Sequence, residues 1–188
     1  MDPRDTPSAD VVLAEVLGEA QRIGFLGDRP IGEVIDDSRA FVEALAPIVF
    51  GTVADLGSGG GVPGLVVAVD RPDLRAVLID RRERRTDFLR RAVSRAERAG
   101  VVAAGAVDVW CDDVAAVARR SPGIFDAVTA RGFGPPDVTL ALGSQLVRVD
   151  GLVIIAEPPS GDRWPADLLE RTGVDLVRRG RVAVFRRR

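Results

Sequence analysis

The sequence predicts an α/β domain whose mostly parallel, seven-stranded sheet ends in an antiparallel hairpin, with helices before the sheet. Apolar residues recur at helical spacing near the start of the chain, short apolar runs alternate with helical segments after Gly51, and two strand-like runs close the chain. Alternating strands and helices are typical of a parallel sheet covered on both faces. We therefore expect one domain over residues 1–188, with an N-terminal helical segment at 1–50 and an α/β core at 51–188.

Two helices are predicted in the N-terminal segment. The first ends near Gly24 and turns one apolar face inward, made of Val12, Val16, Leu17, Ala20 and Ile23. The second is expected from Pro30 to Ala46, because Pro47 stops it. Its inward residues recur at the spacing of helical turns and are Val34, Phe41, Val42 and Leu45.

Five short apolar runs in the core are expected to be parallel strands. They are TVADL (52–56), LRAVLID (74–80), AVDVWC (106–111), IFDAVTA (124–130) and GLVIIAE (151–157). Helices are expected from Pro63, from Arg82 to Ala99, and after the third and fourth strands. Each helix would return the chain by a right-handed crossover.

The residue inventory excludes several classes of enzyme. The chain has no His and no Tyr, its 26 basic residues are all Arg, and Asn is absent. Ser-His-Asp and Cys-His catalysis, Schiff-base chemistry, the Walker lysine and His-ligated zinc are therefore excluded, and we expect no metal. Because the pKa of Arg exceeds about 12, a general base would have to be Asp, Glu, cysteine, a backbone group or water.

Charge and cysteine content favour a cytoplasmic protein. No apolar run is long enough to cross a bilayer, and the start MDPRDTPSAD does not resemble a signal peptide. The lone Cys111 excludes an internal disulfide.

The charge is unevenly distributed along the chain. Residues 1–50 carry four Arg against ten acids, whereas residues 51–188 carry 22 Arg against 18 acids. Basic clusters in the second part would suit nucleic acid, although surface statistics alone favour solvated protein faces. We expect a monomer that binds no membrane.

The segment ADLGSGGGVPGL at 54–65 contains two overlapping nucleotide-binding patterns. From Gly59 it follows the dinucleotide pattern Gly-x-Gly-x-x-Gly, and from Asp55 it follows Asp-x-Gly-x-Gly-x-Gly, the first motif of S-adenosylmethionine-dependent methyltransferases. In the dinucleotide pattern the strand should run almost directly into Gly59, and Asp55 with Gly57 would interrupt it. In the methyltransferase pattern Asp55 ends the strand, where it can orient the loop and meet the methionine ammonium. The second pattern fits better.

The next two strand ends also carry groups suited to a nucleoside. Asp80 is placed to accept hydrogen bonds from both ribose hydroxyls, which suits either cofactor. Asp113 and Val114 follow the third strand, where a carboxylate, a backbone N–H and apolar walls can hold adenine. The alternative is that turns favour Asp and Gly for conformational reasons alone.

The order of the predicted elements also favours the methyltransferase pattern. Residues 175–179 and 181–187 are separated by Gly180 alone, which suits an antiparallel hairpin and not a parallel crossover. A parallel sheet finished by an antiparallel strand resembles the Rossmann-like fold of class I S-adenosylmethionine-dependent methyltransferases.

Three segments together resemble one family within that class. They are DLGSGGGVPGL, RPDLRAVLIDRRERRTDFLRR and FDAVTARGFGPP. They are similar to the 16S ribosomal RNA guanine-N7 methyltransferases, the glucose-inhibited division protein B (RsmG) family, over residues 51 to about 135. The resemblance implies a cytoplasmic enzyme that uses S-adenosylmethionine and acts on ribosomal RNA or the small ribosomal subunit.

The resemblance also implies a set of site residues. Gly57 and Val62 would line the methionine side, Val114 and Ala115 would contact adenine, and Arg131 matches the family's cofactor-site arginine. The full set expected to bind cofactor is Asp55, Gly57, Ser58, Gly59, Gly61, Val62, Asp80, Arg81, Asp113, Val114, Ala115 and Arg131. Residues expected on the substrate side are Arg131, Phe133 and Arg84.

One departure from the family pattern concerns an adenine contact, because Ala115 replaces a glutamate. The others fall on the substrate side: the Asn-Leu-Thr segment is absent, and Glu157-Pro158-Pro159 replaces a Lys-Gly pair. The family's His-x-x-Asp-Ser element survives only as Asp37-Ser38, behind Val34. Two further hypotheses therefore stay open: a methyltransferase of a small molecule or protein, and a catalytically silent relative that binds RNA or protein.

A site without His, Lys or Tyr is suited to methylating guanine N7. N7 already presents a lone pair, so its methylation needs no general base, whereas an alcohol or phenol acceptor usually does. No catalytic base is therefore predicted. RNA phosphates would meet one helix face formed by Arg84, Arg91, Arg95 and Arg98. The same face would also suit plain solvation. Trp110, Phe133 or Trp164 could stack on a base, although core packing is favoured for Trp110 and Phe88.

Overall fold

The computed structural model describes residues 8–158 and 163–188 of the chain. The expectation of no signal peptide falls largely on residues 1–7, which lie outside the described residues, as does Pro159. Within the described residues, no helix is both long and apolar enough to cross a membrane. Nor do these residues contain a group of three or more His, Cys, Asp or Glu side chains that could hold a metal ion.

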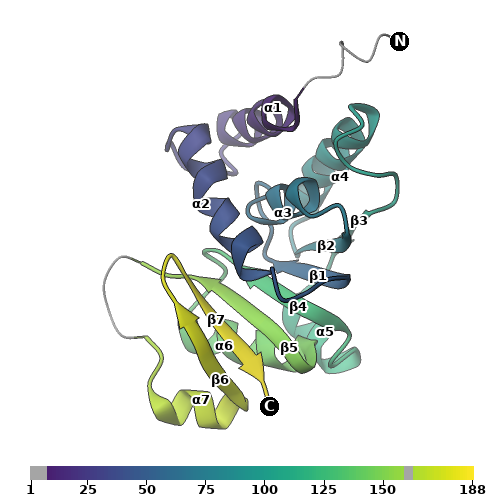
Figure 1. The fold of residues 1–188 in the computed structure, drawn as a ribbon. Coiled ribbons are helices and arrows are strands. Elements are labelled where there is room, and N and C mark those ends of the chain that lie inside the picture. Colours follow the sequence, from purple (N-terminus) through teal and green to yellow (C-terminus); the bar gives the residue numbers. More distant parts are fainter. Residues whose placement is uncertain (1–7, 159–162) are drawn as a thin grey trace.

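A seven-stranded sheet forms the centre of the molecule (Figure 1). Its strands are β1 (Gly51–Leu56), β2 (Leu74–Asp80), β3 (Val107–Cys111), β4 (Phe125–Ala130), β5 (Val147–Ala156), β6 (Val174–Arg179) and β7 (Val182–Arg187). They are arranged in the order β3-β2-β1-β4-β5-β7-β6. The first five run parallel, and β7 pairs antiparallel with both β5 and β6. The predicted mostly parallel sheet with a closing hairpin is confirmed.

Helices cover both faces of this sheet (Figure 1). On one face lie α1 (Ala9–Arg22), α2 (Ile31–Ala44), α3 (Gly64–Asp70) and α4 (Glu83–Arg98). On the other lie α5 (Val114–Arg120), α6 (Pro136–Leu146) and α7 (Ala166–Thr172). Alternate residues of a strand point to opposite faces, so Val77 and Ile79 of β2 pack on the α5–α6 side while Ala76 and Leu78 pack under α3 and α4. Burial on both sides explains why these strands appear as continuous apolar runs.

Three details differ from the sequence prediction. Residues Gly180 and Arg181 connect β6 to β7, so the connection is longer than the single glycine expected. The short helix α7 was not predicted; Leu168 is its one fully buried residue, which leaves too weak an apolar stripe to find. Ile23 was expected to face inward but is 43% exposed, because α1 ends at Arg22 and the chain turns away.

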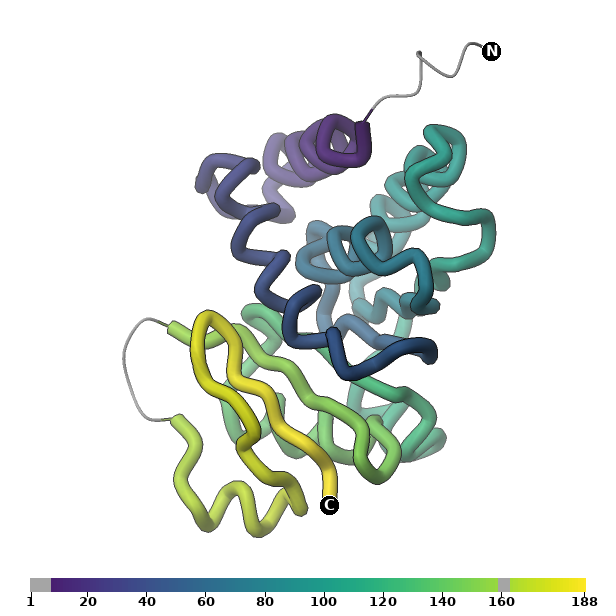
Figure 2. The backbone as a smooth tube through the Cα atoms, in the orientation of Figure 1, coloured from purple at the N-terminus to yellow at the C-terminus, as the bar shows by residue number. Residues whose placement is uncertain are grey.

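Side-chain bonds attach α2 to the core. Nη1 of Arg71 donates to the carbonyl of Leu45 at 2.9 Å, and its Nη2 donates to the carbonyl of Ile48. Nε of Arg39 in α2 donates to Asp70 at the end of α3 at 3.1 Å. At the other side of α2, the β6–β7 hairpin turns back beside the helix, as Figure 2 shows, and Arg178 pairs with Glu43 at 3.7 Å. These contacts hold α2 against the end of α3 on one side and against the β6–β7 hairpin on the other.

Gly64, the first residue of α3, tests how closely this helix packs on the sheet. A Cβ atom at Gly64 would lie 2.3 Å from Cδ2 of Leu78 and 2.8 Å from Oδ2 of Asp55. We expect Gly64→Ala to lower the free energy of unfolding by about 1 to 3 kcal/mol through overpacking. Urea unfolding followed by circular dichroism measures the change.

Gly18 in α1 provides the matched control. A Cβ atom there would meet nothing within 4 Å. Gly18→Ala should raise the free energy of unfolding by about 0.5 to 1 kcal/mol, since alanine is the better helix former. Equal urea midpoints for Gly64→Ala and the wild type would contradict the packing described for α3.

Candidate functional site

A glycine-rich turn follows β1 at the carboxyl end of the sheet. Gly57 and Gly61 have φ angles of +68° and +97°, in the left-handed region that favours glycine. A Cβ atom on Gly57 would lie 2.7 Å from Cδ2 of Phe133, and one on Gly61 would lie 2.5 Å from Cδ1 of Leu65. Both the backbone conformation and the available space therefore require glycine at these positions.

Asp55 holds this turn from beneath. Its Oδ1 accepts a hydrogen bond from Oγ1 of Thr129 at 2.9 Å, and its Oδ2 accepts one from the N–H of Gly64 at 3.2 Å. Burial raises the pKa of the Asp55 carboxyl to about 6, although these hydrogen bonds oppose the rise. The carboxylate thus links β1, β4 and α3. Its engaged oxygens face the protein interior.

Asp80 at the end of β2 fixes the other side of the turn. Its Oδ2 accepts from the N–H of Gly59 at 3.0 Å, and its Oδ1 accepts from the N–H of Arg82 at 2.9 Å. Nη1 of Arg85 lies 3.5 Å from the same Oδ2. Because each carboxylate oxygen can accept more than one hydrogen bond, Asp80 keeps acceptor capacity toward the hollow that it lines.

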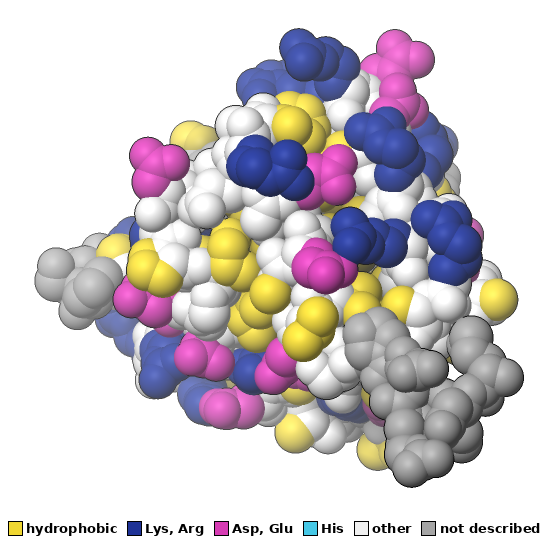
Figure 3. All heavy atoms as spheres, turned by 90° about the horizontal axis from the view of Figure 1, so that it is seen from above, with side chains coloured by type: hydrophobic (Ala, Val, Ile, Leu, Met, Phe, Trp, Pro, Cys, Tyr) yellow, Lys and Arg dark blue, Asp and Glu magenta, His cyan; other side chains and the backbone are white. Residues whose placement is uncertain are grey.

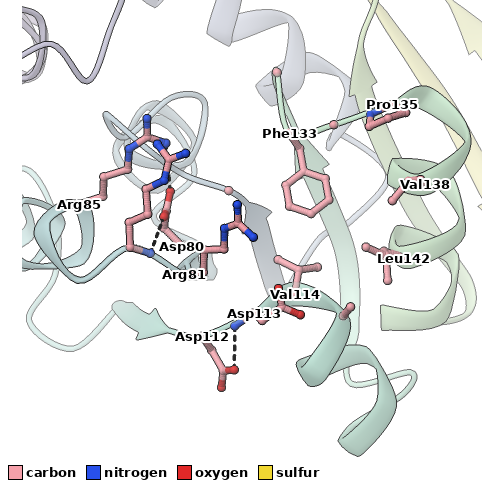
Figure 4. A pocket seen from close by; sticks show the side chains of 15 residues that line it. Asp80, Arg81, Arg85, Asp112, Asp113, Val114, Phe133, Pro135, Val138 and Leu142 are labelled. Atoms are coloured by element: carbon pink, nitrogen blue, oxygen red, sulfur yellow. Dashed lines mark hydrogen bonds and ion pairs between the residues drawn. The ribbon is translucent and has the colours of Figure 1, made fainter.

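The first hollow, of about 530 Å³, lies over these strand ends. Figure 4 shows charged and apolar residues on its two sides. Asp80, Arg81 and Arg85 lie on one side; the apolar side chains of Phe133, Val114, Val138 and Leu142 lie on the other. A volume of this size, with polar groups on one side and apolar side chains on the other, is typical of small-molecule sites.

Six of the residues expected to bind cofactor line this first hollow. They are Gly57, Asp80, Arg81, Asp113, Val114 and Ala115. The carboxylate of Asp113 also caps α5, because its Oδ1 accepts from the N–H of Ala116 at 3.0 Å. The remaining loop residues form the turn beneath the hollow or pack behind it; they are Asp55, Ser58, Gly59, Gly61 and Val62.

A second hollow, of about 810 Å³, adjoins the start of the loop that follows β4. Its lining comes from segments far apart in the sequence: Arg29, Asp37, Phe41, Arg131, Ala156, Glu157, Pro158, Gly180 and Arg181. Arg131 lines this hollow and is absent from the lining of the first, whereas Phe133 of the same loop lines the first. The loop at 131–135 therefore contributes residues to both hollows.

Arg131 has a guanidinium group whose hydrogen-bonding capacity is not fully used. Its Nη1 is buried and has no hydrogen-bond partner among the described residues. Burial lowers the pKa of Arg131, and the charge of Asp37 partly offsets that effect. A buried N–H without a partner costs free energy, so this atom is prepared for an acceptor that is not part of the described chain.

The arginine face of α4 lies away from both hollows. Arg95 forms an ion pair with Glu15 of α1, and Arg84 lies beside Gly24 and Phe25. Figure 3, seen from the side on which α1 lies in Figure 1, shows carboxylates interspersed among the arginines. Neither observation singles out a continuous basic surface on this side of the molecule.

The expected stacking role of Trp164 is not supported. Its side chain is buried at 4% exposure, stacks edge-on against Phe185 and donates from Nε1 to Glu157 at 2.9 Å. Trp110 is half-buried and packs against Phe125, as favoured from the sequence. Phe133 alone of the three lies in a hollow.

The sequence analysis missed several site residues. Arg85, at the first hollow, had a signal in the resembling segment but was not assigned a role. Arg29 and Arg181, at the second hollow, have no local sequence signal, because they face it only after α2 and the hairpin have packed together. Asp37 was named from the sequence only as a surviving part of a family element, and Glu157 only as a departure from the family pattern.

Comparisons with known proteins agree with this geometry. A profile of the family described as "rRNA small subunit methyltransferase G" matches residues 11–158. A protein of that name from Mycobacterium sp. strain JLS is 30% identical over 191 aligned positions, covering 95% of this chain and 80% of the relative. One from Sorangium cellulosum strain So ce56 is 35% identical over 130 positions, covering 65% of this chain and 48% of the relative. The second alignment thus spans about half of that relative's length.

A solved structure shares the fold. The antibiotic-resistance methyltransferase Kmr superposes with a TM-score of 0.57 at 16% sequence identity, over 80% of this chain and 93% of that one. At this identity the likeness concerns the arrangement of strands and helices alone.

The buried Asp55 predicts a pH dependence of stability. Its pKa is about 6 in the folded chain against an ordinary value of 3.8, so folding favours its protonated form. The stability gained from Asp55 is complete below about pH 3.8 and is lost as the pH rises through about 6. We expect the wild type to lose up to about 3 kcal/mol of unfolding free energy relative to Asp55→Asn between about pH 3.5 and pH 7.5. Parallel urea titrations of both proteins across this range measure the difference; a constant difference would contradict the raised pKa.

Proposed function

Because the chain belongs to the ribosomal RNA small subunit methyltransferase G family, we propose that it transfers the methyl group of S-adenosylmethionine to N7 of a guanine in 16S ribosomal RNA. The observation that carries this proposal is the first hollow, where the glycine turn, Asp80 and the start of α5 meet at the carboxyl ends of neighbouring parallel strands. Sites in open α/β sheets lie at this edge.

The residues of the first hollow fit S-adenosylmethionine. The buried carboxylate of Asp80 is available to the ribose hydroxyls, and Val114, Val138 and Leu142 offer apolar walls to adenine. Gly57 lines the hollow without a side chain, beside the ring of Phe133, and its backbone would face the methionine portion. Asp113 keeps one carboxylate oxygen outside its helix cap, toward the adenine amino group. The fit thus assigns a role to each strand end predicted from the sequence.

The chemistry needs orientation more than proton transfer. When bound, S-adenosylmethionine supplies a methyl group whose bond to sulfur breaks as the bond to guanine N7 forms, with no proton released. The chain's contribution is to hold acceptor and donor in line, which can supply about 7 to 11 kcal/mol of the barrier. Neither His nor Lys is needed, which agrees with their absence from the chain. Asp55 is engaged with Thr129 and Gly64 and serves the turn, not a proton transfer.

The loop at 131–135 indicates where the methyl acceptor would bind. Donor and acceptor atoms must approach to about 3 Å before transfer. Because residues of this loop line both hollows, an acceptor in the second hollow would meet the methionine end of the cofactor near Arg131 to Phe133. Ribosomal RNA would then approach over α2 and the β6–β7 hairpin, where Arg29 and Arg181 offer positive charge. The predicted contributions of Arg84 and the α4 face would be peripheral to this approach.

The activity itself is testable with unmodified small-subunit RNA. Purified protein, S-adenosylmethionine labelled in its methyl group, and 16S rRNA transcribed in vitro or assembled into small-subunit particles should yield 7-methylguanosine, located by nuclease digestion and mass spectrometry. Label in protein or small molecules of a cell extract, and none in RNA, would favour a methyltransferase of another acceptor. A chain that binds RNA but not S-adenosylmethionine would be a silent relative.

Asp80→Asn tests the assignment of the first hollow. The change removes one anionic acceptor and should weaken S-adenosylmethionine binding by about 1 to 3 kcal/mol, the usual effect of leaving polar partners poorly matched. Isothermal titration calorimetry measures the affinity.

Asp108→Asn is the matched control for this substitution. Asp108 lies on the neighbouring strand β3, exposed and paired with Arg75 at 3.5 Å, outside the first hollow. It should bind S-adenosylmethionine as the wild type does. Wild-type affinity in Asp80→Asn would refute the ribose assignment, and tighter binding of NAD than of S-adenosylmethionine would reverse the choice of cofactor.

A further inference from the structure

The second hollow contains a donor and an acceptor that the proposed cofactor site does not use. The donor is Nη1 of Arg131, which is buried without a hydrogen-bond partner among the described residues. The acceptor is the carboxylate of Asp37 on α2, which lines the same hollow. Their side chains come from the loop after β4 and from the N-terminal helices, and both residues line a space large enough for a nucleotide.

Asp37 is held by a partner that can be exchanged. Its Oδ2 accepts from Nη1 of Arg29 at 2.6 Å, and the same guanidinium also contacts Glu33 at 3.1 Å. The side chains of Arg29 and Asp37 are 51% and 39% exposed, so the pair is solvated and worth little in free energy. A ligand that offers N–H donors to Asp37 can therefore replace Arg29, which would keep Glu33 as its partner.

The other carboxylate of the hollow is fully engaged. Oε1 of Glu157 accepts from Arg163 at 3.1 Å and from Nε1 of Trp164 at 2.9 Å, and its Oε2 accepts from Arg179 at 2.9 Å. This side chain is 3% exposed. Glu157 therefore serves the structure around β5 and β7, and Asp37 is the carboxylate with room for a ligand.

Guanine is the base whose edge matches this pair. Its N1–H and N2 amino group are adjacent donors that suit one carboxylate, and its O6 is an acceptor that suits a guanidinium. Adenine presents an acceptor at N1 and a donor at N6, so both contacts would be repulsive. Methylation at N7 adds a further condition, because the N7 lone pair must stay free of hydrogen bonds. Contacts to the N1, N2 and O6 side satisfy that condition.

We propose that the second hollow is the acceptor-base site, in which Asp37 accepts from N1–H and N2–H of the target guanine and Arg131 donates to its O6. This inference rests on the proposed function and adds the residues that select the base. It places Arg131 on the substrate side of the loop at 131–135. The Arg29–Asp37 pair then acts as the closed form of the site before the base enters.

The test replaces one donor on the base and one acceptor on the protein. The guanosine that the wild type methylates is replaced by inosine, which lacks the N2 amino group, in 16S rRNA assembled by ligation. The wild type should show a fall in kcat/KM of at least about tenfold on inosine, the scale of losing part of a bidentate contact. Asp37→Asn should lower kcat/KM on guanosine by a similar factor and show little further loss on inosine.

Asp36→Asn is the matched control, since Asp36 is the neighbouring α2 residue, 70% exposed and paired with Arg39 outside the hollow. It should keep the wild-type preference for guanosine over inosine. Calorimetry with S-adenosylmethionine alone should give wild-type affinity for Asp37→Asn and for Arg131→Lys, while Arg131→Lys lowers methyl transfer at least about tenfold because it loses the planar guanidinium.

Each contrary outcome has a distinct meaning. An unchanged guanosine-to-inosine ratio in Asp37→Asn, in a protein that still methylates guanosine, would overturn the base-site inference and leave the proposed function standing. Weakened S-adenosylmethionine binding in Arg131→Lys would move Arg131 to the cofactor. No methylation of RNA by the wild type would overturn the proposed function, and the inference with it.

Discussion

The site depends on one buried carboxylate. Asp55 accepts hydrogen bonds from Thr129 on β4 and from the backbone of Gly64 at the start of α3, and so joins the two central strands to the helix that follows the glycine turn. A charged group in this position is costly, as its raised pKa shows. Despite this cost, the carboxylate holds both ends of the turn between Asp55 and Gly64 against the sheet. Asp80 then fixes its middle through the N–H of Gly59.

From this anchored turn the functional surface divides in two. The first hollow uses strand ends that are neighbours in the sheet, and it combines carboxylates and arginines with apolar side chains. The second uses α2, the ends of β4 and β5, and the hairpin, and its chemistry is that of paired charges. In the proposed function the donor and the acceptor would require different recognition but a common boundary. The loop at 131–135, which lines both hollows, would form that boundary.

The parts of this arrangement that the sequence predicts are those encoded locally. Strand runs, the glycine turn and the carboxylates at 80 and 113 follow from periodicity and short motifs, and the structure places them where expected. No local sequence pattern predicts the second hollow, because Arg29, Asp37 and Arg181 come together only when α2 packs beside the hairpin. Trp164 shows the opposite failure. Trp164 was named as an aromatic residue that could stack on a base, but Glu157 accepts its N–H and holds the ring in the core.

The contact between the N-terminal segment and the glycine turn bears on how the chain can be divided. A Cβ atom on Gly60 would lie 2.6 Å from Cγ of Leu26 and 3.0 Å from the carbonyl oxygen of Phe25, so the outer side of the turn is covered by residues that precede the sheet. The ring of Phe25 also packs edge-on against Phe88, with the guanidinium of Arg85 over it. The α/β core is therefore not a self-contained module that could be excised or grafted. A fragment starting at Gly51 would expose the back of its own nucleotide loop to water.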